Sequence, residues 1–262
     1  MKVSLQLFAL ALAPSLVFGA IFPPNSHVKM LDSTTFKKAM KANQTSIVAF
    51  VAPWCGHCQR LAPEYVKAAD KLHPLIPTYA VDCDKEENKP LCADQRVQGF
   101  PTIKLFPRGN KVAPMTYDSG ERTSGAIFNW ASRRVPNHVT KLSSVGEIQA
   151  WGEKTQDKTT LLLLTKDKKV PLLWKVLANK YSGKLELAAH RDEDGKAIEA
   201  LGFDEKTKVL VFPAGSSKPI KYDGLTKYEP LAKFFKSILD GTADLKIPGE
   251  NAESSGRAED EL

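Results

Sequence analysis

Residues 46–58 read SIVAFVAPWCGHC, and this stretch decides the fold. Its first seven residues, 46–52, are nearly all apolar, which is typical of a strand covered on both faces of a sheet. From Cys55 onward, apolar residues recur every three or four positions, which indicates a helix that Pro63 is expected to kink. The stretch therefore predicts a buried strand that leads directly into a helix, with Cys55 and Cys58 at the junction.

Strands and helices alternate on both sides of this junction. In residues 21–137 we expect strands at 28–31, 46–52, 78–82, 102–106 and 115–117, and helices at 36–42, 55–72, 86–95 and 124–134. In residues 138–241 we expect strands at 159–165, 184–190, 208–213 and 219–224, and helices at 144–154, 172–181, 197–201 and 228–239. The second segment repeats the pattern of the first, which indicates a duplication. The predicted fold class is α/β, with two tandem domains that each contain a mixed central sheet flanked by helices.

The two segments can be aligned on their Phe-Pro pairs, 106–107 and 212–213. Pro101 then corresponds to Thr207, and the second segment has no cysteine. We therefore expect the second domain to keep the scaffold of the first and to lack its chemistry.

The composition excludes several classes of protein. Four cysteines in 262 residues are too few for a disulfide-dense scaffold, and 42% apolar with 26% charged residues is incompatible with disorder of the whole chain. The net charge is +7, but the lysines are scattered among acids, which indicates a solvated surface and no nucleic-acid site. No uninterrupted apolar run reaches the roughly 18 residues of a membrane span.

The first residues have the pattern of a secretory signal peptide. Residues 1–20 contain a lysine, an apolar stretch and the small residues Gly19 and Ala20, after either of which we expect cleavage. The alternative is a short membrane anchor, which Pro14 and the shortness of the stretch disfavour.

The last residues resemble an endoplasmic reticulum retention signal. Glu259–Leu262 read EDEL, with an acid where the usual signal has a basic residue, and the alternative is an acidic tail that ends in leucine by chance. We expect residues 242–262 to form a flexible tail that presents this signal to a retention receptor. Localisation in the endoplasmic reticulum lumen would also give meaning to the glycosylation sequon at Asn43, which is Asn-Gln-Thr.

The CGHC sequence points to redox chemistry. A cysteine at the start of a helix meets unpaired N–H groups and the positive end of the helix dipole, which stabilise a thiolate. We therefore expect Cys55 to be the exposed nucleophile and Cys58, one turn later, to be the buried resolving thiol. His57 would add partial or full positive charge, and a stabilised thiolate makes the disulfide a stronger oxidant. Gly56 and His57 between the cysteines favour donation or shuffling of disulfides over simple reduction.

A zinc site is the main chemical alternative. Cys83 and Cys92 could complete a four-cysteine set with the CGHC pair. An oxidising compartment, and Trp54 in a strand-to-helix turn, favour redox work instead, and we expect no metal and no organic cofactor. Cys83 and Cys92 bracket a short helix, for which we expect a structural disulfide; a second redox pair and free thiols are the alternatives.

Three motifs carry a resemblance to a known family. VAPWCGHCQRLAPEY (51–65), VDCD (81–84) and GFPTIKLF (99–106) are similar to the catalytic domain of the protein disulfide isomerase family. The whole plan resembles the small fungal members: a signal peptide (1–20), a catalytic thioredoxin domain (21–137), a redox-inactive thioredoxin-like domain (138–241) and a retention tail.

The resemblance assigns further roles. Pro101 matches the family's cis-proline beside the disulfide, so Trp54, Phe100 and Pro101 are expected to bind substrate. A trans turn proline is the alternative. Arg122 matches the family's mobile arginine, which approaches the resolving cysteine and lowers its pKa. The alternative for Arg122 is a solvated surface residue.

The sequence departs from the family at one pair of positions. The family's buried glutamate, which accepts the proton of the resolving cysteine, is replaced by Ala49, and its usual lysine partner is replaced by Ala80. Losing both is physically coherent, because either charge alone would be buried without a partner. Water, Asp82 or His57 are the remaining routes for the proton.

We therefore expect a thiol-disulfide oxidoreductase that forms and rearranges disulfides in unfolded or misfolded secretory polypeptides, with glutathione or a thiol oxidase as its redox partner. One alternative is a dedicated reductase. Another is a chaperone or client-retention module that uses the second domain. Candidate apolar residues for client binding, for which core packing is the competing use, are Trp151, Trp174, Phe203 and Leu161–Leu164.

Overall fold

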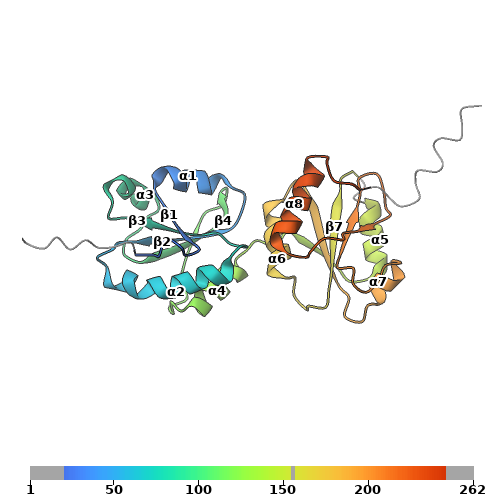
Figure 1. Cartoon of the computed structure of the whole chain (residues 1–262), viewed down its shortest axis with the longest axis horizontal. Coiled ribbons are helices and arrows are strands. Elements are labelled where there is room, and N and C mark those ends of the chain that lie inside the picture. Colours follow the sequence, from blue (N-terminus) through green and yellow to red (C-terminus); the bar gives the residue numbers. More distant parts are fainter. Residues whose placement is uncertain (1–20, 155–156, 246–262) are drawn as a thin grey trace, which may run out of the picture.

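The computed structural model describes residues 21–154 and 157–245, and the expected signal peptide and retention signal lie outside them. The chain forms two α/β units that lie beside each other (Figure 1). Each unit has a mixed five-stranded sheet with helices on both faces, which confirms the predicted fold class. Within the described residues no helix is long and apolar enough to cross a membrane.

The first unit is built around a fully buried central strand, β2. Its elements are β1 (Val28–Leu31), α1 (Ser33–Lys41), β2 (Ser46–Val51), α2 (Gly56–Leu72), β3 (Thr78–Asp82), the 3-10 turn η1 (Glu86–Asn88), α3 (Lys89–Asp94), β4 (Thr102–Asn110), β5 (Met115–Thr116) and α4 (Ser124–Arg133). The strand order is β1-β3-β2-β4-β5. Helices α2 and α4 pack on one face of the sheet and α1 and α3 on the other (Figure 1). Apolar layers thus cover β2 on both sides, as its uninterrupted apolar sequence requires.

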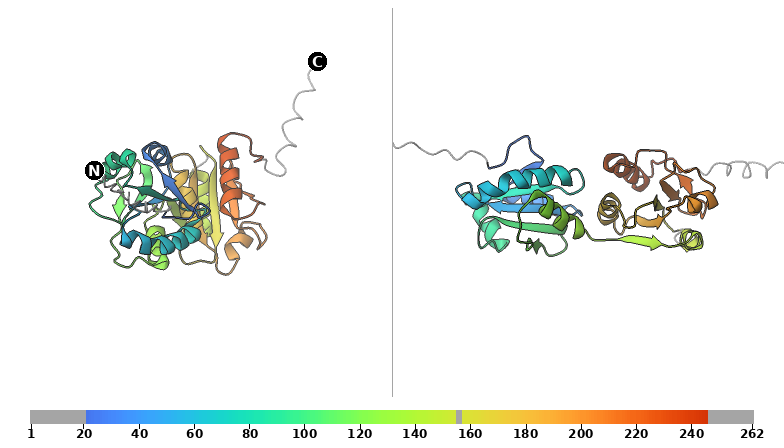
Figure 2. Two further views of the ribbon diagram at one scale, coloured as in Figure 1. Left: turned by 60° about the vertical axis from the view of Figure 1, so that its left-hand side comes forward. Right: turned by 90° about the horizontal axis from the view of Figure 1, so that it is seen from below.

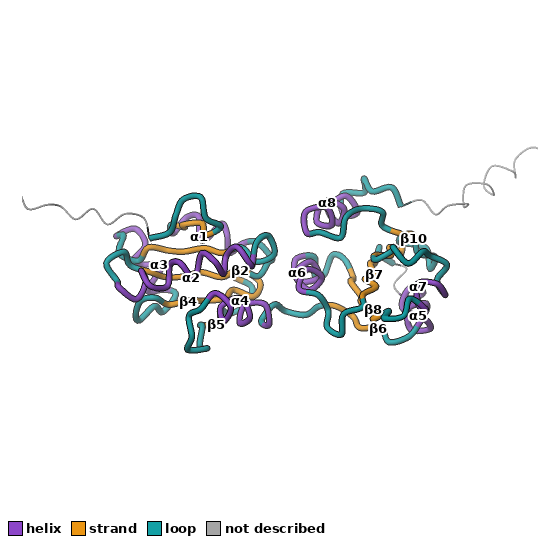
Figure 3. Tube along the Cα trace, turned by 60° about the horizontal axis from the view of Figure 1, so that its bottom comes forward, coloured by secondary structure: helices purple, strands orange, loops and turns teal. Residues whose placement is uncertain are grey.

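The second unit has the same topology. Its elements are β6 (Val139–Leu142), α5 (Val145–Lys154), β7 (Thr160–Thr165), α6 (Leu172–Lys180), β8 (Glu186–Arg191), α7 (Lys196–Ala200), β9 (Val209–Phe212), β10 (Ile220–Lys221) and α8 (Tyr228–Leu239). The strand order β10-β9-β7-β8-β6 is that of the first unit read from the opposite edge. Helices α6 and α8 cover one face and α5 and α7 the other (Figure 3).

The strand registers of the two units agree with the sequence alignment. Leu105 of β4 pairs with Ile47 of β2, and Val211, which the alignment places on Leu105, pairs with Leu161 of β7. Each strand of one unit therefore has a counterpart in the other with the same place in the sequence and in the sheet, as expected for a duplication.

Strand β6 was not predicted from the sequence. Only Val139 and Leu142, the first and last of its four residues, are buried, so no apolar alternation marks it. It is an edge strand that pairs with β8 alone. Helix α1 also begins earlier than predicted, because the Asp32 carboxylate accepts hydrogen bonds from the N–H groups of Thr34 and Thr35 and caps the helix at Ser33.

Candidate active site

Helix α2 begins immediately after Cys55. The N–H groups of Cys58 and Gln59 donate to the Cys55 carbonyl at 2.9 and 3.1 Å, and no side chain caps the helix. Cys55 is half-buried, whereas Cys58 is completely buried in the core between the sheet and α2. Both are free thiols in this structure. The short turn after β2 thus places one sulfur at the helix start and the other one turn inside it.

The surroundings of Cys55 favour its thiolate. Partial burial is the largest single influence and opposes ionisation. The backbone N–H and the thiol of Cys58, the backbone N–H of His57 and the charge of Arg60 together outweigh it, so the pKa of Cys55 lies below its ordinary value. This is the electrostatic environment of a nucleophilic cysteine.

The surroundings of Cys58 favour its protonated form. Burial, followed by the adjacent Cys55 thiol, raises its pKa, while a backbone hydrogen bond from Ala52 and the charge of Arg122 act in the opposite direction; the net result is a pKa of about 12. At neutral pH Cys58 is therefore a thiol, and Cys55 is the sulfur that attacks.

Arg60, which the sequence analysis did not single out, lies one turn beyond His57 on α2. Its guanidinium donates to the Nδ1 atom of His57 at 2.9 Å. Because a guanidinium cannot accept a hydrogen bond, His57 must accept at Nδ1 and keep its proton on Nε2. The permanent positive charge beside Cys55 is thus that of Arg60. In the sequence, the i, i+3 spacing of His57 and Arg60 was the signal that could have indicated this contact.

Two aromatic residues flank the half-buried Cys55 sulfur. The Cys55 Sγ atom lies 3.6 Å from the Phe100 carbonyl oxygen, and the Phe100-Pro101 peptide bond is cis. The rings of Trp54 and Phe100 meet edge to face with centroids 6.1 Å apart. Trp54 is 57% exposed, and its Nε1 atom donates to Asp84 at 2.9 Å. The structure therefore brings the expected substrate-binding residues together around Cys55.

Arg122 connects the loop before α4 to the loop that contains Pro101. Its guanidinium donates to the Pro101 carbonyl oxygen at 3.5 Å, and its charge acts on Cys58. The residue as a whole is exposed to solvent. Arg122 is thus placed near the resolving thiol and not in bulk solvent alone.

Two methyl groups occupy the positions of the family's buried ion pair. Ala49 and Ala80 pair directly across β2 and β3, and both are completely buried in the core that contains Cys58. Neither side chain can exchange a proton. Asp82, at the end of β3, is half-buried and accepts a hydrogen bond from the Asp84 N–H at 3.0 Å.

Cys83 and Cys92 are joined by a disulfide that ties the end of β3 to α3, with the two Cα atoms 6.0 Å apart. These sulfurs therefore do not form a zinc set with the CGHC pair. Within the part of the chain that the structure describes, no three His, Cys, Asp or Glu residues gather in a metal-binding group.

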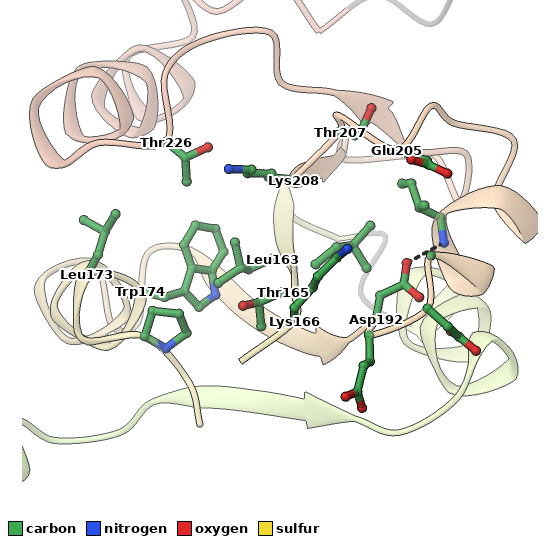
Figure 4. A pocket seen from close by; sticks show the side chains of 16 residues that line it. Leu163, Thr165, Lys166, Leu173, Trp174, Asp192, Glu205, Thr207, Lys208 and Thr226 are labelled. Atoms are coloured by element: carbon green, nitrogen blue, oxygen red, sulfur yellow. Dashed lines mark hydrogen bonds between the residues drawn. The ribbon is translucent and has the colours of Figure 1, made fainter. Parts of the chain in front are cut away.

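The second unit has a cavity of about 590 Å³ at the carboxyl ends of β7 and β8 (Figure 4). Trp174 and Leu163 form part of its apolar wall, and Thr207, the counterpart of Pro101, also lines it. The cavity thus occupies the place that the dithiol takes in the first unit. Its ionisable lining residues are Lys166, Asp192, Glu193, Asp194, Glu205 and Lys208.

Most of the proposed client-binding residues are core residues. Trp174 and Leu161–Leu164 are buried in the two apolar layers of the second unit. Trp151 and Phe203 are half-buried and pack against the layer beneath α5 and α7. Only Trp174 and the end of β7 also border the cavity.

Similarity to known proteins first indicates the class of protein. Residues 27–133 match the thioredoxin family, and the CGHC pair lies at the helix start of that domain. The chain is therefore a thioredoxin-domain protein.

The chain is also similar to several curated proteins over longer stretches. The chain is 39% identical over 169 residues to a mitochondrial thioredoxin domain-containing protein of Schizosaccharomyces pombe (63% of this chain, 46% of the relative). It is 27% identical over 258 residues to a protein disulfide-isomerase of Saccharomyces cerevisiae (84% and 81%) and 28% identical over 276 residues to a protein disulfide isomerase-like protein of Oryza sativa (97% and 72%). The chain spans about half the length of the first of these relatives. Along most of its length the chain is thus similar to protein disulfide-isomerases.

Proposed function

We propose that this chain is a thiol-disulfide oxidoreductase that forms and rearranges disulfides in secretory proteins. One observation carries the proposal: the two sulfurs of the CGHC pair are electrostatically opposite. Cys55 is accessible with a lowered pKa, and Cys58 is buried with a pKa of about 12. This asymmetry supports an ordered exchange that begins and ends at Cys55.

In the oxidising direction, a substrate thiolate attacks the Cys55 sulfur of the Cys55–Cys58 disulfide. The S–S bond breaks, a mixed disulfide forms at Cys55, and Cys58 leaves as a thiolate that takes up a proton. A second substrate thiolate then attacks the substrate sulfur of the mixed disulfide and releases reduced Cys55 and Cys58 together with a substrate disulfide.

In the isomerising direction, reduced Cys55 attacks a substrate disulfide and releases one substrate thiolate. That thiolate can attack elsewhere in the substrate, or deprotonated Cys58 can attack Cys55 and release the reduced substrate. Arg122 favours the second route, because its charge lowers the pKa of Cys58.

The proposed place of action is the endoplasmic reticulum lumen. The signal-peptide pattern of residues 1–20 and the EDEL ending at Glu259–Leu262 support it, as do the disulfide-isomerase relatives. The proposed partners are unfolded secretory polypeptides, glutathione or a thiol oxidase for reoxidation, and a retention receptor for the tail.

Refolding of a scrambled disulfide-bonded substrate tests the proposal. We expect wild type to restore substrate activity, Cys55→Ser/Cys58→Ser to have no effect, and Cys58→Ser to accumulate a mixed disulfide at Cys55. A wild type no faster than the double variant would exclude the function. Equilibration with glutathione then gives the reduction potential of the Cys55–Cys58 pair. This one value distinguishes an oxidase, an isomerase and a reductase.

A second candidate function is client binding by the second unit, which the cavity beneath Thr207 supports. The apolar wall with an excess of carboxylates suits an unfolded segment that carries apolar and basic side chains. If the cavity binds clients, Cys55→Ser/Cys58→Ser will still suppress aggregation of a reduced substrate. The further change Leu173→Glu, at a half-buried lining residue, will abolish that suppression.

A further inference from the structure

The two units meet at a joint formed by the loop between α1 and β2 and the carboxyl end of α6. Asn179 of α6 is 1% exposed, and its Nδ2 atom donates to the Thr45 hydroxyl oxygen at 3.0 Å and to the Pro107 carbonyl oxygen at 2.9 Å. Thr45, itself 1% exposed, donates to the same carbonyl at 2.8 Å. A side chain of the second unit is thus enclosed by the first.

Asn43 completes the joint from the opposite direction. Its Nδ2 atom donates to the carbonyl oxygens of Asn179 and Lys180 at 3.4 and 3.3 Å, and its Oδ1 atom accepts from Arg108 at 2.9 Å. The last carbonyls of a helix have no partner within the helix. Asn43 therefore caps the carboxyl end of α6 across the boundary between the units.

Apolar packing surrounds these hydrogen bonds. Val176 of α6 is 3% exposed and belongs to the apolar core of the first unit, and Leu172 packs against the same core. Tyr228, at the start of α8, packs against the cores of both units. Helices α6 and α8 lie on the side of the second unit that faces the first (Figure 1, Figure 2). The joint is a packed interface and not a tether.

Two residues of this joint, Asn43 and Thr45, also belong to the glycosylation sequon. We propose that glycosylation of Asn43 and docking of the two units exclude each other, so that the sequon selects between a docked unmodified chain and a glycosylated chain whose units are apart. In the cell this inference rests on the secretory localisation proposed above. The geometry on which the inference is based is independent of that localisation.

The chemistry acts on the same atom that closes the joint. Transfer from a lipid-diphosphate oligosaccharide breaks the sugar C1–O bond to phosphate and forms a C1–N bond to Asn43 Nδ2. Nδ2 releases one proton, and the lipid diphosphate leaves. In the docked structure Nδ2 donates to the carbonyl oxygens of Asn179 and Lys180, so a sugar there would have to displace the end of α6.

The sequon hydroxyl is equally inaccessible. Thr45 is buried beneath Asn179, and a transferase must reach this residue to recognise the acceptor. Residues 43–45 precede α6 in the chain and emerge first during synthesis. Modification must therefore come before docking.

Transfer to purified chains tests the inference independently of localisation and redox activity. The chain is incubated, folded or unfolded, with an oligosaccharyltransferase and a lipid-diphosphate oligosaccharide. We expect the unfolded chain to be modified at Asn43 and the folded chain to be modified at least about tenfold less, because the joint must open first. Equal modification of both, or none of the unfolded chain, overturns the inference.

Refolding the modified chain tests the second half. We expect small-angle scattering to give a larger radius of gyration than for a control with an equal sugar far from the joint. Asn43→Gln/Ser119→Asn/Glu121→Thr supplies that control, because residues 119–121 are exposed beside the loop of Arg122, at the opposite end of the first sheet from Asn43. Equal radii would overturn the inference, whereas loss of disulfide exchange alone would contradict only the proposed function.

Discussion

Cys55 and Cys58 are three residues apart, yet their pKa values move in opposite directions. Burial opposes ionisation of both sulfurs, but at Cys55 it is outweighed by backbone N–H groups and Arg60, and at Cys58 it dominates. A single helical turn thus separates a nucleophile from a thiol that must be deprotonated later. Two charged residues act on these sulfurs from outside the motif, and each can be tested separately.

Replacing Arg60 by alanine should raise the pKa of Cys55. A cation stabilises the thiolate, so its removal lowers the thiolate fraction at neutral pH and slows alkylation by iodoacetamide by about two- to tenfold, while rates well above the pKa stay equal. The measurement is the alkylation rate against pH. Arg60→Lys, which retains the charge, should stay close to wild type, and an unchanged midpoint in Arg60→Ala would show that Arg60 has no electrostatic role.

Replacing Arg122 by alanine should slow the step that uses Cys58. Without this charge the pKa of Cys58, already about 12, rises further, and attack of Cys58 on a mixed disulfide slows by about threefold to tenfold. The lifetime of a glutathione mixed disulfide at Cys55 measures this step. The pH profile of Cys55 alkylation is the internal control and should not change; if both rates fall together, Arg122 acts on the structure of the site.

Much of the site follows from local sequence, because a Cys-x-x-Cys pair between a buried strand and a helix can only place its first sulfur at the helix start. Contacts from distant segments do not follow in the same way. Asp84 holds the Trp54 indole from thirty positions further along, and nothing in the local pattern indicates that pairing. The position of Arg122 required the family resemblance as well.

At the scale of elements, strand β4 is longer than the sequence predicts and extends to Asn110. Gly109 makes this extension possible: its φ is +56°, and a Cβ atom there would lie 2.1 Å from the Met40 carbonyl oxygen. The Gly109 N–H donates to the Gln44 carbonyl oxygen at 3.2 Å, which secures the loop between α1 and β2. This close approach joins segments that are distant in sequence, so periodicity could not reveal it.

Gly109→Ala should therefore destabilise the first unit by about 2–4 kcal/mol, through both the positive φ and the steric overlap. The denaturant midpoint reports the change. Gly120→Ala is the matched control, because Gly120 has φ of +73° but a Cβ atom there would meet nothing within 4 Å, and it should cost only about 1 kcal/mol. Equal midpoints for the two variants would show that the Met40 contact relaxes freely.

At the scale of the molecule, the strand-and-helix pattern predicted two repeated units but not how they meet. The joint depends on Val176, which lies in the helix predicted over 172–181 and which the structure places in the core of the other unit. An apolar residue in a helix indicates that its side chain is buried, but it does not indicate which segment of the protein it packs against.

Weakening this apolar contact should uncouple the two units. In wild type we expect one cooperative calorimetric transition, and in Leu172→Ala/Val176→Ala two transitions or a clearly broadened one, because each lost buried side chain costs about 1–3 kcal/mol. Val112→Ala, at a side chain that is 43% exposed, should leave the transition unchanged. A single sharp transition in the double variant would show that the units unfold together for another reason.

The pair Ala49 and Ala80 beneath Cys58 affects how the reaction rate depends on the composition of the solution. With hydrocarbon under the sulfurs, the hydrogen ion that Cys58 sheds must leave toward the mouth of the site, where water, a dissolved base, Asp82 or His57 can take it up. At fixed pH and ionic strength, added imidazole should therefore speed the closing of the Cys55–Cys58 ring in proportion to its concentration. The turnover rate of such a protein therefore depends on the concentration of small bases in the surrounding solution.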